Sequence, residues 1–357
     1  MDYFFFILCF LSSINIKIKG LDDFFSDYMD LENTNCIRGI FVWLIIFCHK
    51  RGYGINKKYL FLKILSNLGQ KVVSLFLFYS GFGINESLKK KGKLYVKTLP
   101  KKACILFIKF QLILFMFLIV NIYIFNNKIT LKKYLLSSIF KSSLGNSNWF
   151  AFSIIIFYIY SYISFRFIKG RHFFGIIIIS IISGIHSKFV YIYFYPKAIY
   201  TVDTILCFVT GFYYSHMKTY LDKILLVNDV NYFGVVSMTI LIYYKFFSKF
   251  SLISRSIKNV LFALLIVFIS IKVKFNNAFL KFLNSHSFSI YLLQRLVMSI
   301  VKRKRIFNHS DFFQISFEFA TIFFIASFFD KYTSFIDKLF KGKYDINKTK
   351  TKLLLTF

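Results

Sequence analysis

Acidic residues, prolines and any ordered set of cysteines are scarce in this chain of 357 residues. Only 15 Asp and Glu stand against 47 Lys and Arg, and there are two prolines. The five cysteines are odd in number and scattered, at Cys9, Cys36, Cys48, Cys104 and Cys207. This spacing excludes a disulfide framework and gives no pattern of metal ligands. The chain also lacks a Gly-x-Ser-x-Gly nucleophile elbow and a glycine-rich phosphate loop.

Apolar and aromatic side chains are abundant instead, at 57% and 22% of the residues. Apolar runs of membrane-spanning length alternate with short lysine-rich loops, which is typical of a polytopic helical membrane protein. We therefore expect an all-α membrane protein with about ten transmembrane helices. The predicted spans are 35–49, 66–84, 103–125, 148–168, 172–186, 199–215, 230–247, 257–273, 278–300 and 312–329. The fifth is short enough to be tilted or partly re-entrant.

A shorter apolar stretch, from Tyr3 to Ile14, precedes these spans. It is too short to cross a membrane and lacks the basic start of a secretory signal, so we expect an interfacial or signal-like helix. Alternatively, Met29 is the true initiator. The sequence thus divides into an N-terminal extension at 1–34, a transmembrane domain at 35–330 and a basic tail at 331–357.

The formal net charge of +32 is carried mainly by lysines in the loops. In a soluble protein it would indicate nucleic acid, but loop lysines between apolar runs instead favour contact with anionic membrane lipids. The two most basic segments are Lys89–Lys102 and the tail after the tenth span. An even number of spans puts both on one side, which the positive-inside rule makes the cytoplasm, together with both termini. The loops after the first and ninth spans are also basic, so the asymmetry is small.

Two ionisable side chains share one face of the first span. Arg38 and His49 are eleven residues apart, which is about three helical turns and about 16 Å along the axis. An ionisable residue in a membrane span is costly unless it lines a polar cavity, so the pair predicts a lined passage. The alternative is that Arg38 extends to the lipid headgroups and His49 is merely interfacial.

Polar residues interrupt other spans. Ser80-Gly81-Phe82 ends the second span, where the glycine favours close helix packing. Asn146–Phe150 begins the fourth, where Asn or Ser could cap the helix and Trp149 could belong to an aromatic belt. Glu318, in the tenth span, favours a structural pairing with a basic neighbour over a catalytic role.

Asp203 and the ninth span carry further candidates. A carboxylate inside an apolar helix needs a partner, and the candidates are His49, Arg38 and Arg295. Tyr291 and Gln294 belong to a polar stripe of the ninth span, and such a stripe is more typical of a cavity than of a lipid-facing surface.

The chemistry that these residues suit is proton transfer. Imidazole titrates near neutral pH, so His49 could take a proton from a substrate hydroxyl while Asp203 orients the ring. The hydroxyl would then attack an activated carbonyl. We expect neither a metal nor a bound cofactor for this reaction.

The ordered motifs resemble the acyltransferase-3 family of integral membrane O-acyltransferases. The similarity covers about residues 35–300 and rests on Asn35–His49, Phe78–Phe82, Asn148–Phe150, Leu206–Gly211 and Ser289–Gln294. It implies ten helices, both termini in the cytoplasm, acyl-coenzyme A as co-substrate, an essential histidine at His49, and Arg38 as a donor-side or orienting cation. In this class the acceptor is a hydroxyl of a bacterial cell-surface glycan or lipid-linked sugar, and the location is the inner membrane.

The chain departs from the family pattern at two places. Many members have two arginines after the second helix, where this chain has Lys101 and Lys102, and many end the ninth-helix motif in histidine, where it has Gln294. Lysine can still contact the phosphates of coenzyme A, without the bidentate fork of arginine. We expect Ser80, Trp149, Asp203, Tyr291 and Gln294 to line the substrate cavity.

The sequence therefore predicts a membrane O-acyltransferase, an acyltransferase of groups other than amino-acyl groups, with acetyl as the expected acyl group. The main alternative is a transporter or flippase for a lipid-linked sugar or polysaccharide, in which the polar stripes would form a pathway. That alternative predicts inverted repeats with broken helices at matching positions. A membrane glycan polymerase is a further alternative.

Overall fold

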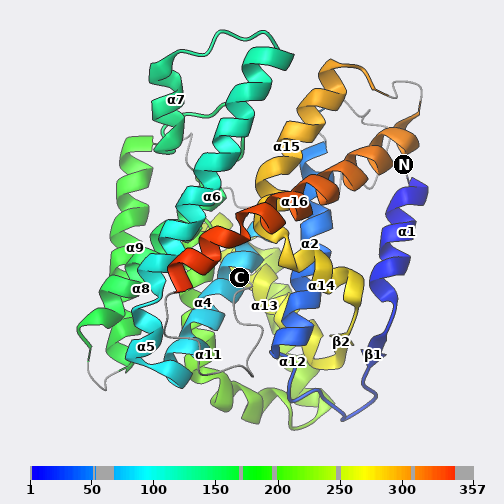
Figure 1. The fold of residues 1–357 in the computed structure, drawn as a ribbon. Coiled ribbons are helices and arrows are strands. Elements are labelled where there is room, and N and C mark those ends of the chain that lie inside the picture. The colour runs from blue at the N-terminus through cyan, green and yellow to red at the C-terminus, as the bar shows by residue number, and fades with distance from the viewer. Residues whose placement is uncertain are drawn as a thin grey trace.

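The fold is described from a computed structural model, in which α2 and α4 pack at the centre of a helical bundle (Figure 1). The structure describes residues 2–50, 53, 68–168, 172–194, 199–246, 251–306 and 310–341. The elements are α1 (Asp2–Ser13), β1 (Ile16–Ile18), α2 (Leu31–Lys50), α4 (Gly69–Lys91), α5 (Lys93–Val96), α6 (Leu99–Ile119), the π-helix η2 (Val120–Ile124), α7 (Leu131–Ser138), α8 (Trp149–Arg166), α9 (His172–Phe194), α10 (Ile199–Val202), α11 (Ile205–Leu225), α12 (Asp229–Lys245), α13 (Leu252–Lys272), β2 (Val273–Phe275), α14 (Ala278–Ser285), α15 (Ser287–Arg303) and α16 (Asp311–Lys341). From residue 342 onward the predicted basic tail lies outside the described residues.

The predicted all-α class is confirmed. The strands found in the described part of the chain are β1 and β2, a short antiparallel pair in which Ile16 lies opposite Phe275. Each predicted span overlaps one helix or two, but several boundaries are wrong, and the expected number of about ten membrane spans is not confirmed. For example, α11 continues to Leu225, ten residues past the predicted end. The fifth is not short, because α9 continues to Phe194, and α16 extends past the predicted end of the membrane domain to Lys341.

Two predicted spans are interrupted rather than continuous. The segment 199–215 begins as the four-residue α10 and breaks at Asp203 and Thr204 before α11 starts. The segment 278–300 is divided between α14 and α15, which meet at His286. Helix breaks of this kind are tolerated in a membrane protein where surrounding helices bury the freed backbone groups.

The structure supports a membrane protein. Six helical stretches are long and apolar enough to cross a bilayer, namely α2, Lys93–Ile124, α8, α9, α13 and α16. Of the other long helices, α12 and α15 have 17 residues each, and α4 and α11 carry charged side chains near their C-terminal ends. Large apolar side chains are exposed on α9, α12 and α16, among them Ile181, Ile185, Ile192, Leu241, Phe324 and Phe328. Apolar surface of this extent suits contact with lipid tails.

Glycines set the closest helix contacts. A Cβ at Gly81 would lie 2.1 Å from the Phe208 carbonyl oxygen of α11, and one at Gly211 would lie 2.2 Å from the Phe78 carbonyl oxygen of α4. The predicted packing role of Gly81 is therefore confirmed, since no larger side chain fits between these backbones. Gly39 brings α2 equally close to α14.

The N-terminal segment folds back along the bundle. The ring of Phe4 lies 5.0 Å from that of Phe319 in α16, and Phe5 lies 5.6 Å from Trp43 in α2. The Trp43 indole N–H donates to the Ser12 hydroxyl at 3.2 Å. Because α1 runs opposite to α2, its first residues lie level with the C-terminal part of α2 (Figure 1).

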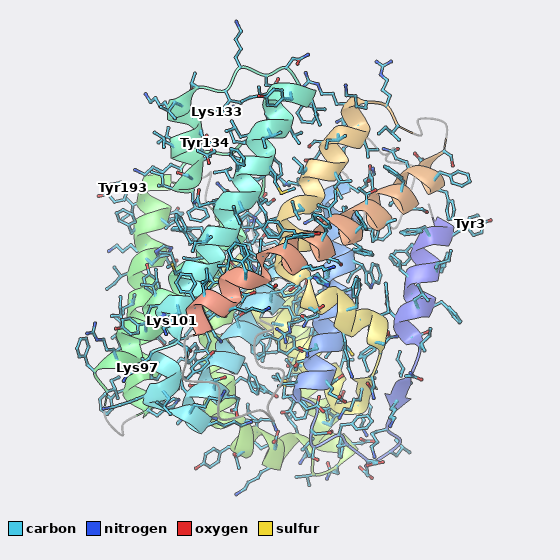
Figure 2. All side chains as sticks on the ribbon, in the orientation of Figure 1. Tyr3, Lys97, Lys101, Lys133, Tyr134 and Tyr193 are labelled. Carbon is cyan, nitrogen blue, oxygen red and sulfur yellow. The ribbon has the colours of Figure 1, made fainter. Side chains whose placement is uncertain are left out.

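The bundle has two ends that carry basic side chains. Lys97 and Lys101 lie at the end where α2 and α6 begin, and Lys133 lies at the opposite end, on α7 (Figure 2). We call the first the Arg38 end and the second the His49 end, after the residues of α2 that lie toward them.

Candidate functional site

Helix α2 presents Arg38 and His49 to the interior of the bundle. The two side chains share a face with Val42 and Ile45, which follow at spacings of three and four residues. Arg38 is 5% exposed. One nitrogen of the His49 ring, Nδ1, is buried and has no hydrogen-bond partner among the described residues. The alternative that this pair faces headgroups or lipid is therefore wrong for Arg38, and His49 faces α15.

The Arg38 guanidinium is held by neutral groups. Its Nε donates to the Thr34 carbonyl at 3.3 Å, and its Nη2 donates to Asn35 Oδ1 at 2.5 Å. The phenols of Tyr79 in α4 and Tyr158 in α8 lie within electrostatic range. No carboxylate of the described residues forms an ion pair with this guanidinium. Within the described part of the chain, Arg38 is thus a buried cation without a carboxylate counter-ion, which is costly in a membrane interior.

Of the two predicted coenzyme-binding lysines, the structure turns one toward Arg38. The Lys102 ammonium lies 3.2 Å from the Tyr95 hydroxyl and 5.9 Å from the centre of the Tyr158 ring. Tyr158 therefore adjoins both cations. Lys101 is exposed on the outer surface (Figure 2), because consecutive residues of a helix point about 100° apart.

At the His49 end the imidazole meets the polar stripe of α15. The centres of the His49 and Tyr291 rings are 5.9 Å apart. Gln294 and Arg295 also interact with the His49 side chain, and the Gln294 amide nitrogen donates to the Tyr291 carbonyl at 3.0 Å. The structure thus brings together the predicted base and two predicted lining residues, Tyr291 and Gln294.

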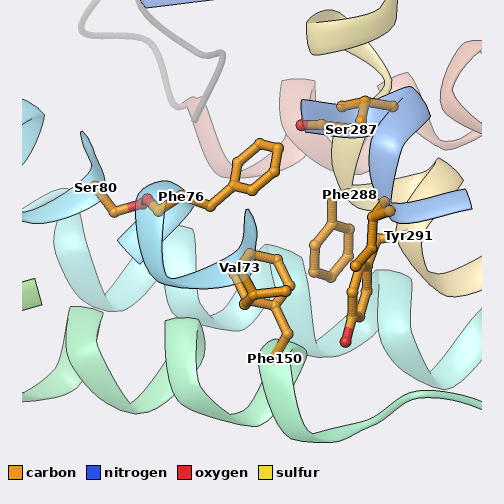
Figure 3. Close-up of a pocket in the computed structure, with 9 residues that line it drawn as sticks. Val73, Phe76, Ser80, Phe150, Ser287, Phe288 and Tyr291 are labelled. Carbon is orange, nitrogen blue, oxygen red and sulfur yellow. The ribbon is translucent and has the colours of Figure 1, made fainter. Parts of the chain in front are cut away.

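A small cavity separates the two ends. Its volume is about 20 Å³, which is room for one water-sized group. Its walls come from α2, α4, α8 and α15, through Val42, Ile45, Val73, Phe76, Ser80, Phe150, Ser287, Phe288 and Tyr291. Figure 3 shows aromatic rings around this space. The prediction of an open polar passage along α2 is therefore wrong, because mostly apolar side chains fill the interval between Arg38 and His49.

The other predicted lining residues have different surroundings. Ser80 lines the cavity, but its hydroxyl donates to the Phe76 carbonyl at 2.8 Å. Trp149 begins α8 outside the cavity wall and packs against Tyr200, with ring centres 6.1 Å apart. The sequence suggested that Asn or Ser could cap α8, but the Asn148 side chain does not. It donates instead to the Ser142 carbonyl at 2.7 Å.

Asp203 pairs with a residue that was not among its predicted partners. Its carboxylate is fully buried and lies 3.0 Å from Arg255 Nε in α13. The Asn259 side chain donates to the Asp203 backbone carbonyl at 3.0 Å. The predicted pairing with His49, Arg38 or Arg295 is therefore wrong, and Asp203 is not part of the cavity wall. The geometry assigns Asp203 to the junction of α10, α11 and α13.

Glu318 pairs with Lys50, the residue after His49, and both side chains are at most 1% exposed. The prediction of a structural basic partner is confirmed. Sequence reasoning missed Tyr79 and Tyr158, which face Arg38. Tyr79 lies within the Phe78–Phe82 motif, which was considered only for Ser80 and Gly81, whereas Tyr158 is one of 24 tyrosines and carries no distinguishing signal.

No family model matches this chain, and searches of characterised proteins and of solved structures find no match either. The resemblance to membrane O-acyltransferases therefore rests on the sequence motifs alone.

Proposed function

We propose that the protein is a membrane O-acyltransferase that moves an acyl group from acyl-coenzyme A to a hydroxyl of a cell-surface glycan or lipid-linked sugar. One observation carries this proposal. Arg38 and His49 lie on one face of α2 with a cavity between them. Among the residues that the structure describes, the buried Arg38 guanidinium has no carboxylate partner and the His49 Nδ1 has no hydrogen-bond partner. An anionic donor and a proton-transfer step would use these two groups.

We infer that all ten long helices cross a bacterial inner membrane, including the four that are shorter or more polar. Neighbouring helices shield the polar residues of those four, as α11 does for Asn85, which donates to Ser215 at 2.8 Å. The positive-inside rule then assigns the Arg38 end, with Lys89–Lys102, to the cytoplasm. The start of α2 lies toward this side, whereas the first residues of α1 lie beside Phe47 at the His49 end (Figure 1). In this orientation the start of α1 is therefore on the side opposite the cytoplasm, and the expectation that both termini are cytoplasmic does not hold.

The donor would enter from the Arg38 end. Acyl-coenzyme A is cytoplasmic and strongly anionic, so its phosphates suit the lysines of the α4–α6 connection and of α6. Lys102 and Arg38 are linked through Tyr158, which lies near both. From Arg38 the distance to His49 is about 16 Å along the axis of α2. Apolar side chains fill this interval, so they must move aside for an extended thioester arm to reach the imidazole.

His49 would act as the general base. The imidazole takes the proton of the acceptor hydroxyl, the hydroxyl oxygen attacks the thioester carbonyl, and the carbon–sulfur bond breaks as the ester forms. The proton on His49 then passes to the departing thiolate, so the enzyme returns to its starting state. Gln294 and Tyr291, beside the ring, fix its orientation.

The experiment that tests the proposal measures transfer of label from [14C]acetyl-coenzyme A to glycan in membranes that contain the protein. His49→Ala should lower transfer by about 10²- to 10⁴-fold, the contribution typical of a general base. His186→Ala is the matched control, because His186 is also partly buried and bonds to Tyr160 at 2.7 Å, away from the cavity. Unchanged transfer in His49→Ala would refute the base assignment.

A transporter or flippase is the second candidate, favoured by the two interrupted helices. The breaks are not equivalent, since α10 has four residues before its break and α14 has eight. Glycan mass analysis separates the candidates. Deletion of an acyltransferase removes an acyl mass increment from the glycan, whereas deletion of a transporter changes the exported amount or chain length.

A further inference from the structure

The cavity between Arg38 and His49 lies where the acyl group of a donor would arrive. Ile45 and Val42 line it from α2, one and two turns before His49. Tyr291 also lines it, and its ring contacts the His49 imidazole. The cavity is therefore separated from the proposed base by the Tyr291 ring, which lines the one and packs beside the other. This inference rests on the proposed function.

The lining suits a hydrocarbon group. Three phenylalanines and three branched aliphatic residues form most of the wall. The Ser80 hydroxyl is bonded to a backbone carbonyl of its own helix. The Tyr291 hydroxyl is buried and has no hydrogen-bond partner among the described residues, so it can donate to a carbonyl oxygen near His49. An acyl group fits this pattern, with its carbonyl toward Tyr291 and its alkyl end among the phenylalanines.

The size of the cavity limits the length of that alkyl end. A volume of about 20 Å³ accepts one methyl-sized group. We propose that this cavity selects the acyl group by length, accepting acetyl and rejecting chains of four or more carbons. Each methylene that a hydrophobic pocket must reject changes kcat/KM by about 10- to 200-fold.

Two phenylalanines from different helices set the limit. Phe76 of α4 packs edge-on against Phe150, with ring centres 6.2 Å apart, and Phe288 of α15 closes the opposite side. Removing the ring of Phe76 extends the cavity without touching Arg38, His49 or Tyr291. Phe288→Leu removes fewer atoms and is the milder second variant.

The test compares transfer of label from acetyl-, butyryl- and hexanoyl-coenzyme A to glycan in membranes containing the whole protein. The wild-type protein should prefer acetyl over butyryl by at least about tenfold in kcat/KM. Phe76→Ala and Phe288→Leu should raise the butyryl-to-acetyl ratio by about tenfold or more. Phe82→Ala is the matched control, since Phe82 lies on the same helix as Phe76, is more deeply buried and faces Tyr214 instead of the cavity. Its ratio should equal that of the wild type.

Other outcomes separate this inference from the proposed function. Equal use of acetyl and butyryl groups by the wild type, or an unchanged ratio in folded Phe76→Ala and Phe288→Leu proteins, would overturn the inference and leave the acyltransferase proposal standing. Transfer from none of the three donors would overturn both.

A further variant, Val42→Phe, fills the cavity. It should abolish acetyl transfer while the protein still elutes as a monodisperse species. Full activity of this variant would also contradict the inference.

Discussion

The buried ion pair between Lys50 and Glu318 allows the cost of an unpaired charge to be measured beside the proposed base. Both side chains are at most 1% exposed, and the pair fastens the last turn of α2 to α16. Replacing one partner leaves the other charge buried alone, which typically costs about 3–5 kcal/mol. We therefore expect Lys50→Met and Glu318→Gln each to lower the free energy of unfolding by about this amount.

The double variant Lys50→Met, Glu318→Leu makes the prediction specific. Replacing a buried pair with apolar side chains of similar volume is often neutral, or stabilising by about 1–4 kcal/mol. Thermal unfolding in detergent should therefore give a double variant at least as stable as the wild type, although each single change is harmful. Additive losses in the double variant would refute this reasoning.

The ion pair Lys19–Asp23 serves as the exposed control. Lys19→Met should change the free energy of unfolding by less than about 1 kcal/mol.

Three further predictions concern other parts of the molecule. Arg38→Lys keeps the charge but loses the forked donor, so KM for acetyl-coenzyme A should rise about tenfold in the transfer assay, with unfolding temperature little changed. Gly211→Ala should destabilise the protein by about 1–3 kcal/mol in thermal unfolding, because a Cβ there meets the Phe78 carbonyl oxygen at 2.2 Å. The Lys274 ammonium holds the pKa of the Asp27 carboxyl below its ordinary value. The stabilisation from this pair is present above the unfolded pKa of about 3.9 and is lost as the pH falls below it. The protection factor against hydrogen exchange at the start of α2, which is corrected for the intrinsic exchange rate at each pH, should therefore fall below about pH 4. Lys274→Met should remove that pH dependence.

Helical periodicity explains what could be predicted about α2. Residues at spacings of three and four share a face, so the common direction of Arg38 and His49 followed from their numbers alone. By the same rule Lys101 and Lys102 point in different directions, although both were predicted to bind the coenzyme. Consecutive lysines cannot both face the interior, and the structure turns only Lys102 toward Tyr158.

Pairing between distant helices could not be predicted in the same way. Asp203 needed a basic partner, but any span with a basic residue was a candidate, and the packing of α13 against α11 decided for Arg255. The end of α9 was missed because Ser183, His186 and Lys188 interrupt its apolar run. In the structure His186 bonds to Tyr160 and Lys188 is exposed, so the helix continues through these polar residues to Phe194.

Other buried charges in the bundle are paired, and this contrast with Arg38 supports the proposed function. The structure pairs Lys50 with Glu318 and Asp203 with Arg255, so partners of opposite charge are available within the fold. Arg38 has none among the described residues and is held only by a carbonyl and an amide. A carboxylate partner stabilises a buried cation whose role is purely structural. A carboxylate beside a cation that binds an anionic ligand competes with the ligand and lowers its affinity. The buried Nδ1 of His49, for which the described residues also offer no hydrogen-bond partner, fits the same explanation. A base that must accept a proton is disabled by a permanent donor at its acceptor nitrogen.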